Sequence, residues 1–255
     1  MALSLKQKVL RIFTAIGFDP RVILSYRHIF LFYKHKKQWK SQGGTITASH
    51  KILTDLSDSA GISKGHYFHQ DLLVANFIAQ KNPKRHVDIA SRVDGFVAHL
   101  AAFRAVEVID IRNLPPSEHK NITFIQADLM NPQNIEKCES LSCLHAIEHF
   151  GLGRYSDPIN VHGHIDGINN LISLLEKNGM LYISFPIGQA DEVHFNAHRV
   201  FHPATILNIP SVKKELTLER FDYVDDDGAL HLNSSIENSI GKTTYGCGIY
   251  SFVRN

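Results

Sequence analysis

Histidine and carboxylate side chains gather in one stretch of the sequence, where they could carry out acid–base or metal chemistry. Seven of the 16 histidines fall between residues 145 and 202. Within this stretch, His145, Glu148 and His149 place two imidazoles and a carboxylate inside five residues. An imidazole changes its protonation near neutral pH, so it can serve as a general base that a carboxylate orients. The spacing also matches a pattern of zinc proteases, so a metal-dependent reaction stays open as an alternative.

Three aspartates further upstream, Asp88, Asp110 and Asp128, lie in or just after successive apolar runs. Asp110 comes 22 residues after Asp88, which is near the spacing at which an acid binds the ribose hydroxyls of a nucleotide. A carboxylate suits this role because both of its oxygens accept hydrogen bonds. Asp128 is then placed to accept a hydrogen bond from an exocyclic amine such as that of adenine. The three acids therefore predict a nucleoside-binding site.

Short apolar runs from about residue 84 onward predict the elements that position these side chains. The first five runs cover residues 86–90, 106–111, 122–126, 141–145 and 180–185. The segments between them are long enough for crossover helices, which predicts parallel strands. Two later runs, 216–224 and 245–253, are expected to pair antiparallel. The predicted fold is α/β, with a doubly wound, mostly parallel, seven-stranded Rossmann-like sheet that binds ligands at the carboxyl ends of its strands.

Residues 1–47 are predicted to form a basic helical extension and linker ahead of a second region, residues 48–255. The first 40 residues carry nine lysines and arginines against one acid, whereas the rest of the chain is mildly acidic. Apolar positions recur at near-helical spacing on both sides of residues 17–20, which predicts two amphipathic helices. Such helices either lie on an anionic membrane surface or pack as a cap on a protein. The acidic main region argues against nucleic acid as its ligand.

Cysteine content and hydropathy bear on the compartment of the protein. The three cysteines have no CxxC or other zinc-ligand spacing, so a reducing compartment fits better than a disulfide framework. The N-terminal stretch has no uninterrupted apolar segment of the kind found in signal peptides. The most apolar run, residues 22–33, is shorter than the ~20 residues that span a bilayer. We expect a cytoplasmic protein, with the inner face of the membrane as an alternative site for the basic extension.

Several strings of the sequence carry a family resemblance. The strings HVDIASRVDG, VEVIDI, ITFIQADL, SLSCLHAIEH and LLEKNGMLYISFP resemble successive motifs of the class I S-adenosylmethionine-dependent methyltransferases. More closely, GHYFHQDL, SRVDGFVAHL, LHAIEHFGLGRYSDP and FNAHRVF resemble the uncharacterised family called domain of unknown function 268, or DUF268. The resemblance begins at about residue 65. It implies a methyltransferase-like domain with S-adenosylmethionine as its cofactor.

The resemblance assigns cofactor-binding roles to residues at the carboxyl ends of the predicted strands. The residues expected to bind the cofactor are Asp88, Ala90, Ser91, Arg92, Gly95, Asp110, Ile111, Asp128, Leu129 and His145. Where these methyltransferases carry a Gly-x-Gly-x-Gly loop, the glycine positions here are Ala90, Arg92 and Asp94, followed by Gly95. Arg92 is expected either to pair with the carboxylate of the cofactor or to fill the pocket. With a single glycine, the loop argues against a pyrophosphate dinucleotide.

The same resemblance implies the catalytic and acceptor-binding residues. The expected catalytic residues are His149 as general base, Glu148 as the group that orients it, and His198. The residues expected to bind the acceptor are Arg154, Tyr155, Asn196 and Arg199. The guanidinium of Arg199 suits a carboxylate or phosphate on the acceptor. In this interpretation no residue binds a metal.

The leading functional interpretation is methyl transfer from S-adenosylmethionine to a hydroxyl of a polar small molecule or glycan. The glycan, and with it a role in surface-polysaccharide biosynthesis, rests only on the association of family members with bacterial surface-polysaccharide enzymes. Two alternatives stay open. One is a non-catalytic binding protein on the same fold, and the other is a metal-dependent enzyme that uses His145, Glu148 and His149 together with His162 or His164. The oligomeric state is left open.

Overall fold

The computed structural model describes residues 20–255, and the chain divides into two compact units between Ile62 and Ser63. The division comes later than the predicted boundary after residue 47, so residues 48–62 belong with the N-terminal unit. This segment contains one short helix, η2 (Asp55–Ser57). Each unit is described by itself below.

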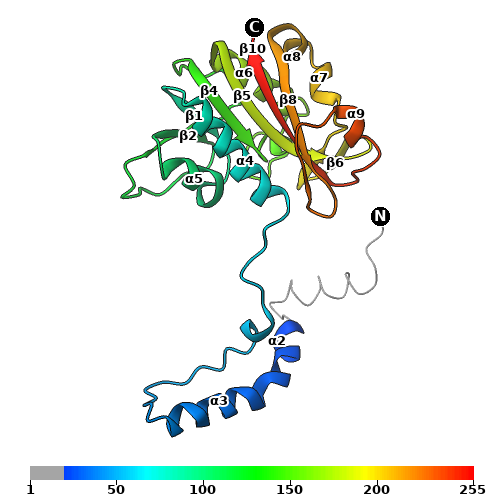
Figure 1. The fold of residues 1–255 in the computed structure, drawn as a ribbon. Coiled ribbons are helices and arrows are strands. Elements are labelled where there is room, and N and C mark those ends of the chain that lie inside the picture. Colours follow the sequence, from blue (N-terminus) through cyan, green and yellow to red (C-terminus); the bar gives the residue numbers. More distant parts are fainter. Residues whose placement is uncertain (1–19) are drawn as a thin grey trace. The chain divides into compact units, whose positions relative to one another are not determined.

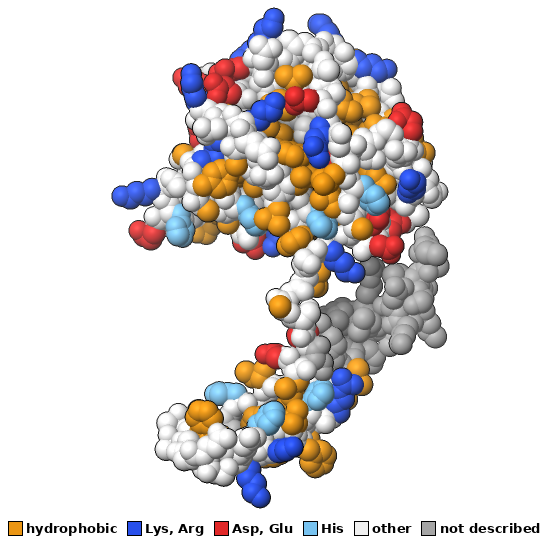
Figure 2. All heavy atoms as spheres, in the orientation of Figure 1, with side chains coloured by type: hydrophobic (Ala, Val, Ile, Leu, Met, Phe, Trp, Pro, Cys, Tyr) orange, Lys and Arg blue, Asp and Glu red, His pale blue; other side chains and the backbone are white. Residues whose placement is uncertain are grey.

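Residues 20–41 of the N-terminal unit are helical. Helix α2 (Pro20–Ser25) continues through η1 (Tyr26–His28) into α3 (Ile29–Ser41), as the sequence predicted for the second half of the extension. The first predicted helix lies outside the described residues. Large apolar side chains of these helices are exposed, among them Leu24, Phe30 and Trp39. Figure 2 shows hydrophobic side chains, in orange, beside basic ones, in blue, on this unit. No helix among residues 20–255 is long and apolar enough to cross a membrane.

The C-terminal unit is built on an eight-stranded sheet with the order β3-β2-β1-β4-β5-β10-β8-β9 (Figure 1). Its strands are β1 (His86–Ile89), β2 (Val106–Asp110), β3 (Ile122–Gln126), β4 (Cys138–Leu144), β5 (Leu175–Ile187), β8 (Leu216–Val224), β9 (Leu230–His231) and β10 (Gly246–Arg254). The eighth strand is the short β9, which pairs only with β8 and which the sequence did not predict. A separate hairpin joins β6 (Glu192–His194) to β7 (His198–Val200).

Strand order reverses at β1, which is where a doubly wound sheet binds its ligands. The chain places β2 and β3 on one side of β1 and β4 and β5 on the other, all of them parallel. Strand β10 lies between β5 and β8 and is antiparallel to both. The predicted parallel strands and the antiparallel late pair are therefore confirmed. The carboxyl ends of β1 and β4 come together at the switch point.

Helices cover both faces of the sheet, and each face has its own hydrophobic core. The helices of this unit are α4 (His66–Lys81), η3 (Val93–Val97), α5 (Ala98–Ala101), η4 (Ile147–His149), α6 (Gly163–Leu174), α7 (Thr205–Asn208), α8 (Pro210–Glu215) and α9 (Ile236–Ser239). Alternating residues of β5 point to opposite faces, as a strand requires. Met180 and Tyr182 join the core beneath α4, whereas Leu181 and Ile183 join the core beneath α6. Figure 1 shows α4 crossing the face that looks toward the viewer.

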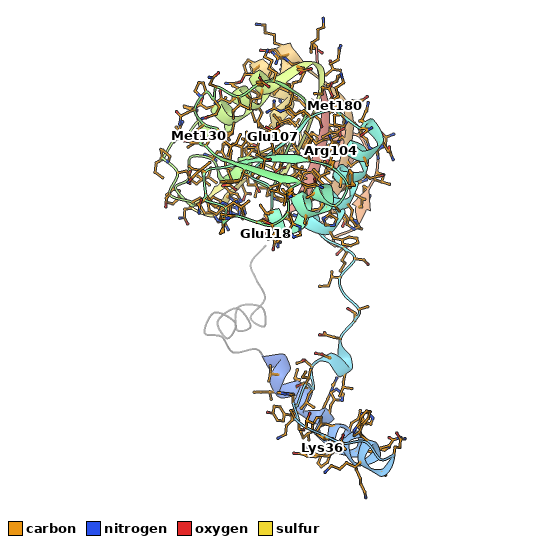
Figure 3. The ribbon with its side chains drawn as sticks, turned by 90° about the vertical axis from the view of Figure 1, so that its left-hand side faces the viewer. Lys36, Arg104, Glu107, Glu118, Met130 and Met180 are labelled. Carbon is orange, nitrogen blue, oxygen red and sulfur yellow. The ribbon has the colours of Figure 1, made fainter. Side chains whose placement is uncertain are left out.

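Two of the expected crossover helices are missing, and their absence shapes the site. Residues 111–121 and 127–137, which follow β2 and β3, contain no helix. The first of these loops contains Pro115 and Pro116 and the second contains Pro132, and proline lacks the N–H that a helix interior needs. Figure 3 labels Glu118 in the first loop and Met130 in the second. Irregular backbone therefore surrounds the carboxyl ends of β2 and β3.

Candidate active site

A cavity of about 840 Å³ lies at the switch point of the sheet. Its walls come from the segments that follow β1, β2, β3 and β4, together with the start of α4 and residues next to β7 and β10. The volume lies within the ~300–1,000 Å³ typical of small-molecule sites. Its lining includes predicted cofactor-binding and catalytic residues, namely Ala90, Ser91, Arg92, Asp110, Ile111, Asp128, Leu129, His145, Glu148 and His149. Three further predicted residues, Arg154, Tyr155 and His198, also line it.

Asp88 holds the loop after β1 in place and does not itself line the cavity. Its carboxylate accepts hydrogen bonds from Ser91 N (3.1 Å), Ser91 Oγ (2.6 Å) and Ser142 Oγ (2.6 Å). Burial raises the pKa of Asp88 to about 6, against the lowering effect of these hydrogen bonds. The predicted direct contact with a cofactor is thus replaced by a positioning role. Ala90, next in the chain, has a φ of 56°, a left-handed conformation that explains why related loops use glycine there.

Arg92 leaves the cavity open, because its side chain pairs with a neighbour at the rim. Its guanidinium is 3.0 Å from Asp94 Oδ2 and lies over the Tyr67 ring, 5.1 Å from the ring centroid. Gly95 does not line the cavity. A Cβ at Gly95 would lie 2.8 Å from Asp71 Oδ2 of α4, so this glycine serves the packing of that helix.

Asp110 ends β2 and lines the cavity, and its carboxylate accepts hydrogen bonds from Arg112. The Arg112 Nε is 3.0 Å from Oδ1, and a terminal nitrogen is 2.5 Å from Oδ2. The backbone N–H of Arg112 also donates to Oδ1 at 2.8 Å. Because Arg112 Nε also lies 3.2 Å from Oδ2, each carboxylate oxygen has two donor atoms of Arg112 within hydrogen-bond distance. A sugar diol can engage both oxygens only if the half-exposed Arg112 side chain swings away. The sequence reasoning missed Arg112.

Asp128 follows β3 and closes a turn at the cavity wall. Its two oxygens accept from the backbone N–H of Met130 and from Asn131 Nδ2, each at 2.9 Å. Leu129 is buried beside it and contributes an apolar surface. This segment therefore places an acid and an apolar side chain next to each other at the cavity wall.

The turn after β4 places Glu148 between two histidines. Glu148 Oε1 is 2.9 Å from His145 Nδ1 and 3.7 Å from His149 Nε2, and Glu148 is 1% exposed. The zinc-protease pattern requires both histidines on one face of a helix. The turn contains only the short 3-10 helix η4, so His145 and His149 do not share such a face. Burial by itself lowers the pKa of His145, but Cys247 and Glu148 raise it above its usual range.

His149 has the geometry of a general base. Its Nδ1 lies 2.7 Å from the carbonyl oxygen of Ala197, which can only accept, so Nδ1 carries the proton and Nε2 has the lone pair. Burial lowers the pKa of His149, against the raising effect of Glu148. This shift favours the neutral imidazole, which is the form that accepts a proton. The His198 ring lies 6.4 Å away, and burial also lowers the pKa of His198.

Arg154 and Tyr155 form part of the cavity wall above these histidines. Arg154 donates to the Ala197 carbonyl at 2.8 Å, and the Tyr155 ring lies between Arg154 and Arg112, with centroid distances of 5.2 and 4.5 Å. An aromatic ring flanked by two cations offers a surface for a polar or anionic acceptor.

Two predicted acceptor-binding residues lie elsewhere. Asn196 is exposed and does not line the cavity. Arg199 is 4% exposed and donates to the carbonyls of Phe150 (2.7 Å) and Glu148 (3.3 Å). Because its guanidinium is used on backbone oxygens, Arg199 supports the η4 turn from beneath and is not available to an acceptor. His162 and His164, which the metal alternative invoked, are also absent from the cavity wall.

The start of α4 and the approach to β10 contribute side chains that sequence reasoning missed. His66 and Tyr67 line the cavity from α4, and Tyr245 lines it from just before β10. The His66 ring stacks 5.3 Å from His145 and 5.6 Å from Tyr245. Burial, and then the neighbouring His145, lowers the pKa of His66 to about 4. The string GHYFHQDL was the available signal for His66 and Tyr67, because it resembled the family although none of its residues had been assigned a function.

Comparison with known proteins agrees with this fold. The model of a family described as "Caenorhabditis protein of unknown function, DUF268" matches residues 120–212, which include β4, η4, β5 and the β6–β7 hairpin. No curated protein matches the chain.

Solved structures with the same fold are methyltransferases. The N-methyltransferase NodS from Bradyrhizobium japonicum WM9, in complex with S-adenosyl-L-homocysteine, has a TM-score of 0.50 and 11% identity, covering 81% of this chain and 93% of that one. An S-adenosylmethionine-dependent methyltransferase from Clostridium acetobutylicum ATCC 824 has a TM-score of 0.50 and 11% identity, covering 79% and 94%. The glycopeptide N-methyltransferase MtfA, complexed with S-adenosyl-L-homocysteine, has a TM-score of 0.51 and 10% identity, covering 82% and 99%. The chain thus has the fold of the class I S-adenosylmethionine-dependent methyltransferases and contains the DUF268 segment within it.

Proposed function

We propose that the protein is an S-adenosylmethionine-dependent methyltransferase that acts on a hydroxyl of a polar small molecule or glycan. The observation that carries the proposal is the cavity at the switch point, where Asp110, Asp128 and the His145–Glu148–His149 turn follow three different strands and face one space. A nucleoside site and an acid–base site are therefore joined in a single cavity.

The residues present fit the proposed cofactor. Asp110 can accept hydrogen bonds from the ribose hydroxyls once the Arg112 side chain has moved away from its two oxygens. Asp128 and Leu129 suit the adenine ring, and the Ala90–Ser91 loop, held by Asp88, adjoins the remaining part of the cavity. Arg92 and Asp94 form a rim that can pair with the amino and carboxylate groups of an amino acid. When bound, S-adenosylmethionine supplies a methyl group that is activated by a sulfonium centre.

His149 is proposed to remove the proton of the acceptor hydroxyl. His149 lines the cavity, and because its Nδ1 is committed to the Ala197 carbonyl, the lone pair is on Nε2, which lies 3.7 Å from Glu148 Oε1. Glu148 and His198 are proposed to position His149 and to stabilise its charged form. A general base typically contributes ~10²–10⁴-fold to the rate. Alignment of the reacting groups in the cavity supplies the larger share.

The acceptor is proposed to lie against Tyr155 and Arg154. The cavity wall there is aromatic and cationic, which favours a polar acceptor with negative charge. The glycan, and a role in surface-polysaccharide biosynthesis, rests on the family resemblance alone.

The N-terminal unit is proposed to bind the surface of an anionic membrane, at the cytoplasmic face. The first 40 residues carry nine basic side chains and one acid. In the described part, Phe30 is 84% exposed and Trp39 57% exposed on the same helix as Lys34 and Lys37. Exposed aromatic and cationic side chains together are typical of helices that lie in the headgroup layer.

Isothermal titration of the full chain with S-adenosylmethionine and S-adenosylhomocysteine tests the proposed function. We expect micromolar binding of both ligands and no binding of NAD. The pyrophosphate of NAD needs several glycines for close contact with the backbone, and this loop has a single glycine. A methyltransferase then transfers radiolabelled methyl groups to one of a panel of glycans and anionic small molecules. A folded protein that binds neither sulfonium nor thioether ligand is instead a binding protein on the methyltransferase fold.

A further inference from the structure

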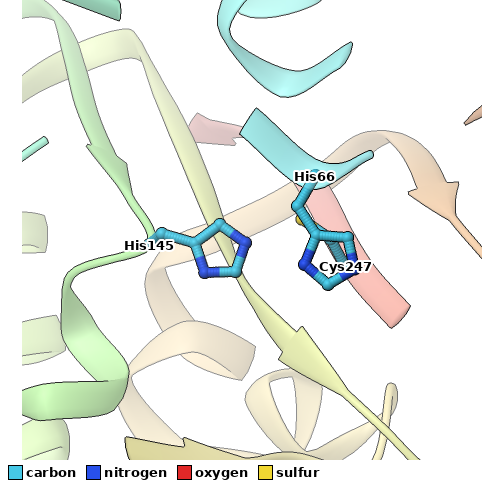
Figure 4. Close-up of side chains that lie close together, drawn as sticks. All are labelled: His66, His145 and Cys247. Carbon is cyan, nitrogen blue, oxygen red and sulfur yellow. The ribbon is translucent and has the colours of Figure 1, made fainter. Parts of the chain in front are cut away.

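Three potential metal ligands meet beside the cavity, although they come from distant parts of the chain. His66 begins α4, His145 follows β4, and Cys247 lies in β10. One nitrogen of each histidine and the Cys247 sulfur all lie within 4.8 Å of one another. Figure 4 shows the two imidazoles side by side, with Cys247 at His66. Among residues 20–255 this is the one such group of three or more histidine, cysteine or acidic ligands.

His145 is oriented as a metal ligand would be. Glu148 Oε1 engages its Nδ1 at 2.9 Å, so Nε2 is the nitrogen left for a ligand. Nε2 is buried and has no hydrogen-bond partner in the described part of the chain, and the side chain is 5% exposed. A carboxylate that holds one ring nitrogen while the other binds the metal is the usual arrangement behind metal-bound histidines. A buried nitrogen without a partner is costly unless a ligand satisfies it.

Cys247 is held rigidly and makes only weak contacts. It is completely buried in β10, which has strands on both sides. Its sulfur lies 3.7 Å from Gln70 Oε1 and 3.7 Å from the Gly248 carbonyl. Cys138 and Cys143 are equally buried but lie outside the group.

We propose that His66, His145 and Cys247 bind one zinc ion, whose fourth position opens into the cavity. One thiolate and two imidazoles form a borderline-soft donor set that suits zinc, and three protein ligands with one open position are typical of its catalytic sites. A tetrahedral ion holds its ligand atoms about 3.3–3.6 Å apart, given Zn–N and Zn–S bonds of ~2.0–2.3 Å. The observed spread of 4.8 Å closes to this by side-chain movements of about 1 Å. The ion displaces the protons that its ligands otherwise carry.

The open position gives the ion a role that rests on the proposed function. His66 and His145 both line the cavity, so an acceptor hydroxyl in the cavity can bind the ion through its oxygen. Coordination lowers the pKa of that hydroxyl, and its proton passes to His149. The oxygen then bonds to the methyl carbon while the C–S electron pair stays on sulfur, which gives a methyl ether, S-adenosylhomocysteine and protonated His149.

Cobalt(II) substitution tests the zinc site on the full chain. Protein treated with a chelator and dialysed is titrated with Co²⁺, whose tetrahedral thiolate complexes show visible d–d bands and a near-ultraviolet charge-transfer band. We expect one Co²⁺ per chain with both signals, and displacement by Zn²⁺. Cys247→Ser removes the charge-transfer band, and His66→Ala weakens binding at least ~100-fold, the upper range seen for loss of an outer-shell partner.

Matched variants control for nonspecific effects. Cys143→Ser changes another completely buried cysteine, and His69→Ala changes another histidine of α4, and both are expected to bind Co²⁺ as the parent does. Circular dichroism confirms that each variant is folded. No charge-transfer band in the folded parent, or an unchanged spectrum in His66→Ala and Cys247→Ser, overturns the proposal.

The same samples separate this proposal from the proposed function. Titration with S-adenosylhomocysteine needs no cobalt, and the cobalt spectrum needs no cofactor. Binding of S-adenosylhomocysteine without a cobalt signal overturns the zinc site alone. A cobalt signal without binding of S-adenosylhomocysteine supports the zinc site and overturns the methyltransferase.

Discussion

Replacement of Asp110 by alanine tests the nucleoside site through the residue that the cavity presents most clearly. Asp110 ends β2, is 6% exposed and lines the cavity, and its carboxylate accepts hydrogen bonds from Arg112. A ribose diol donates two hydrogen bonds to such a carboxylate, and each charge-assisted bond contributes about 1.5–3 kcal/mol. The gross loss in Asp110→Ala is therefore ~3–6 kcal/mol of binding free energy.

Arg112 reduces this loss, because its ion pair with Asp110 must open before both oxygens can accept from a sugar. The Arg112 side chain is 47% exposed, and a solvent-screened pair of this kind contributes no more than about 1 kcal/mol. The variant no longer has to open that pair. The net loss is then ~2–5 kcal/mol, which corresponds to a dissociation constant for S-adenosylhomocysteine raised about 30-fold to 4,000-fold.

The assay is calorimetric titration with S-adenosylhomocysteine, and Glu107→Ala is the matched control. Glu107 lies on the same strand, labelled in Figure 3, and pairs with Arg85 at 2.6 Å, but it does not line the cavity. The control is expected to bind as the parent does, with thermal melts to show that both variants are folded. Unchanged affinity in Asp110→Ala, or an equal loss in Glu107→Ala, would refute the step from strand order to a nucleoside site.

Three further predictions concern the base, the first loop and the N-terminal unit. Burial lowers the pKa of His149, so its imidazole should take up a proton only below pH 6.5 in an NMR titration assigned with His149→Gln. The contribution of His149 to folding stability is then present above pH 6.5 and falls as the pH drops below that value. A measured pKa of 6.5 or more contradicts the base geometry. Ala90 has a φ of 56°, so Ala90→Gly should raise the free energy of unfolding by up to ~1 kcal/mol in urea denaturation, and Ala90→Val should lower it by ~1–3 kcal/mol. A valine variant that is more stable than the glycine variant counts against a strained loop. Neutralising Lys34 and Lys37 should weaken binding to phosphatidylserine vesicles in flotation about fivefold per lysine, at ~1 kcal/mol each, and leave binding to phosphatidylcholine vesicles unchanged. An equal loss of binding on both lipids argues for a protein partner instead.

The strands could be predicted because each is a local apolar run with distinct ends. The five parallel strands and the antiparallel pair β8 and β10 follow from these runs, and so does the binding edge of the sheet. The two-residue strand β9 is too short to produce a pattern. The helices expected after β2 and β3 do not form, and the prolines at 115, 116 and 132 were the signal against them.

Site residues next to the strand ends were placed well for the same reason. Asp110, Asp128 and His149 reach the cavity because a residue just after a parallel strand has little freedom to go elsewhere. Arg199 illustrates the opposite case. Its guanidinium could be identified as an anion-binding group from sequence, but the backbone carbonyls that it satisfies come from a turn about 50 residues away.

The sequence by itself determined seven of the eight strands of the sheet, the edge at which ligands bind, and the acids and histidines near that edge, because these depend on local periodicity and on chain direction. Only the tertiary structure decided that Asp88 and Arg199 support the site from behind, that Arg112 grips Asp110, and that His66, His145 and Cys247 meet. Contacts of this kind join residues that are far apart in the chain, and packing and the order of strands in the sheet bring them together. A helix that begins at His66 and a central strand that carries Cys247 converge on His145 only after the sheet has formed.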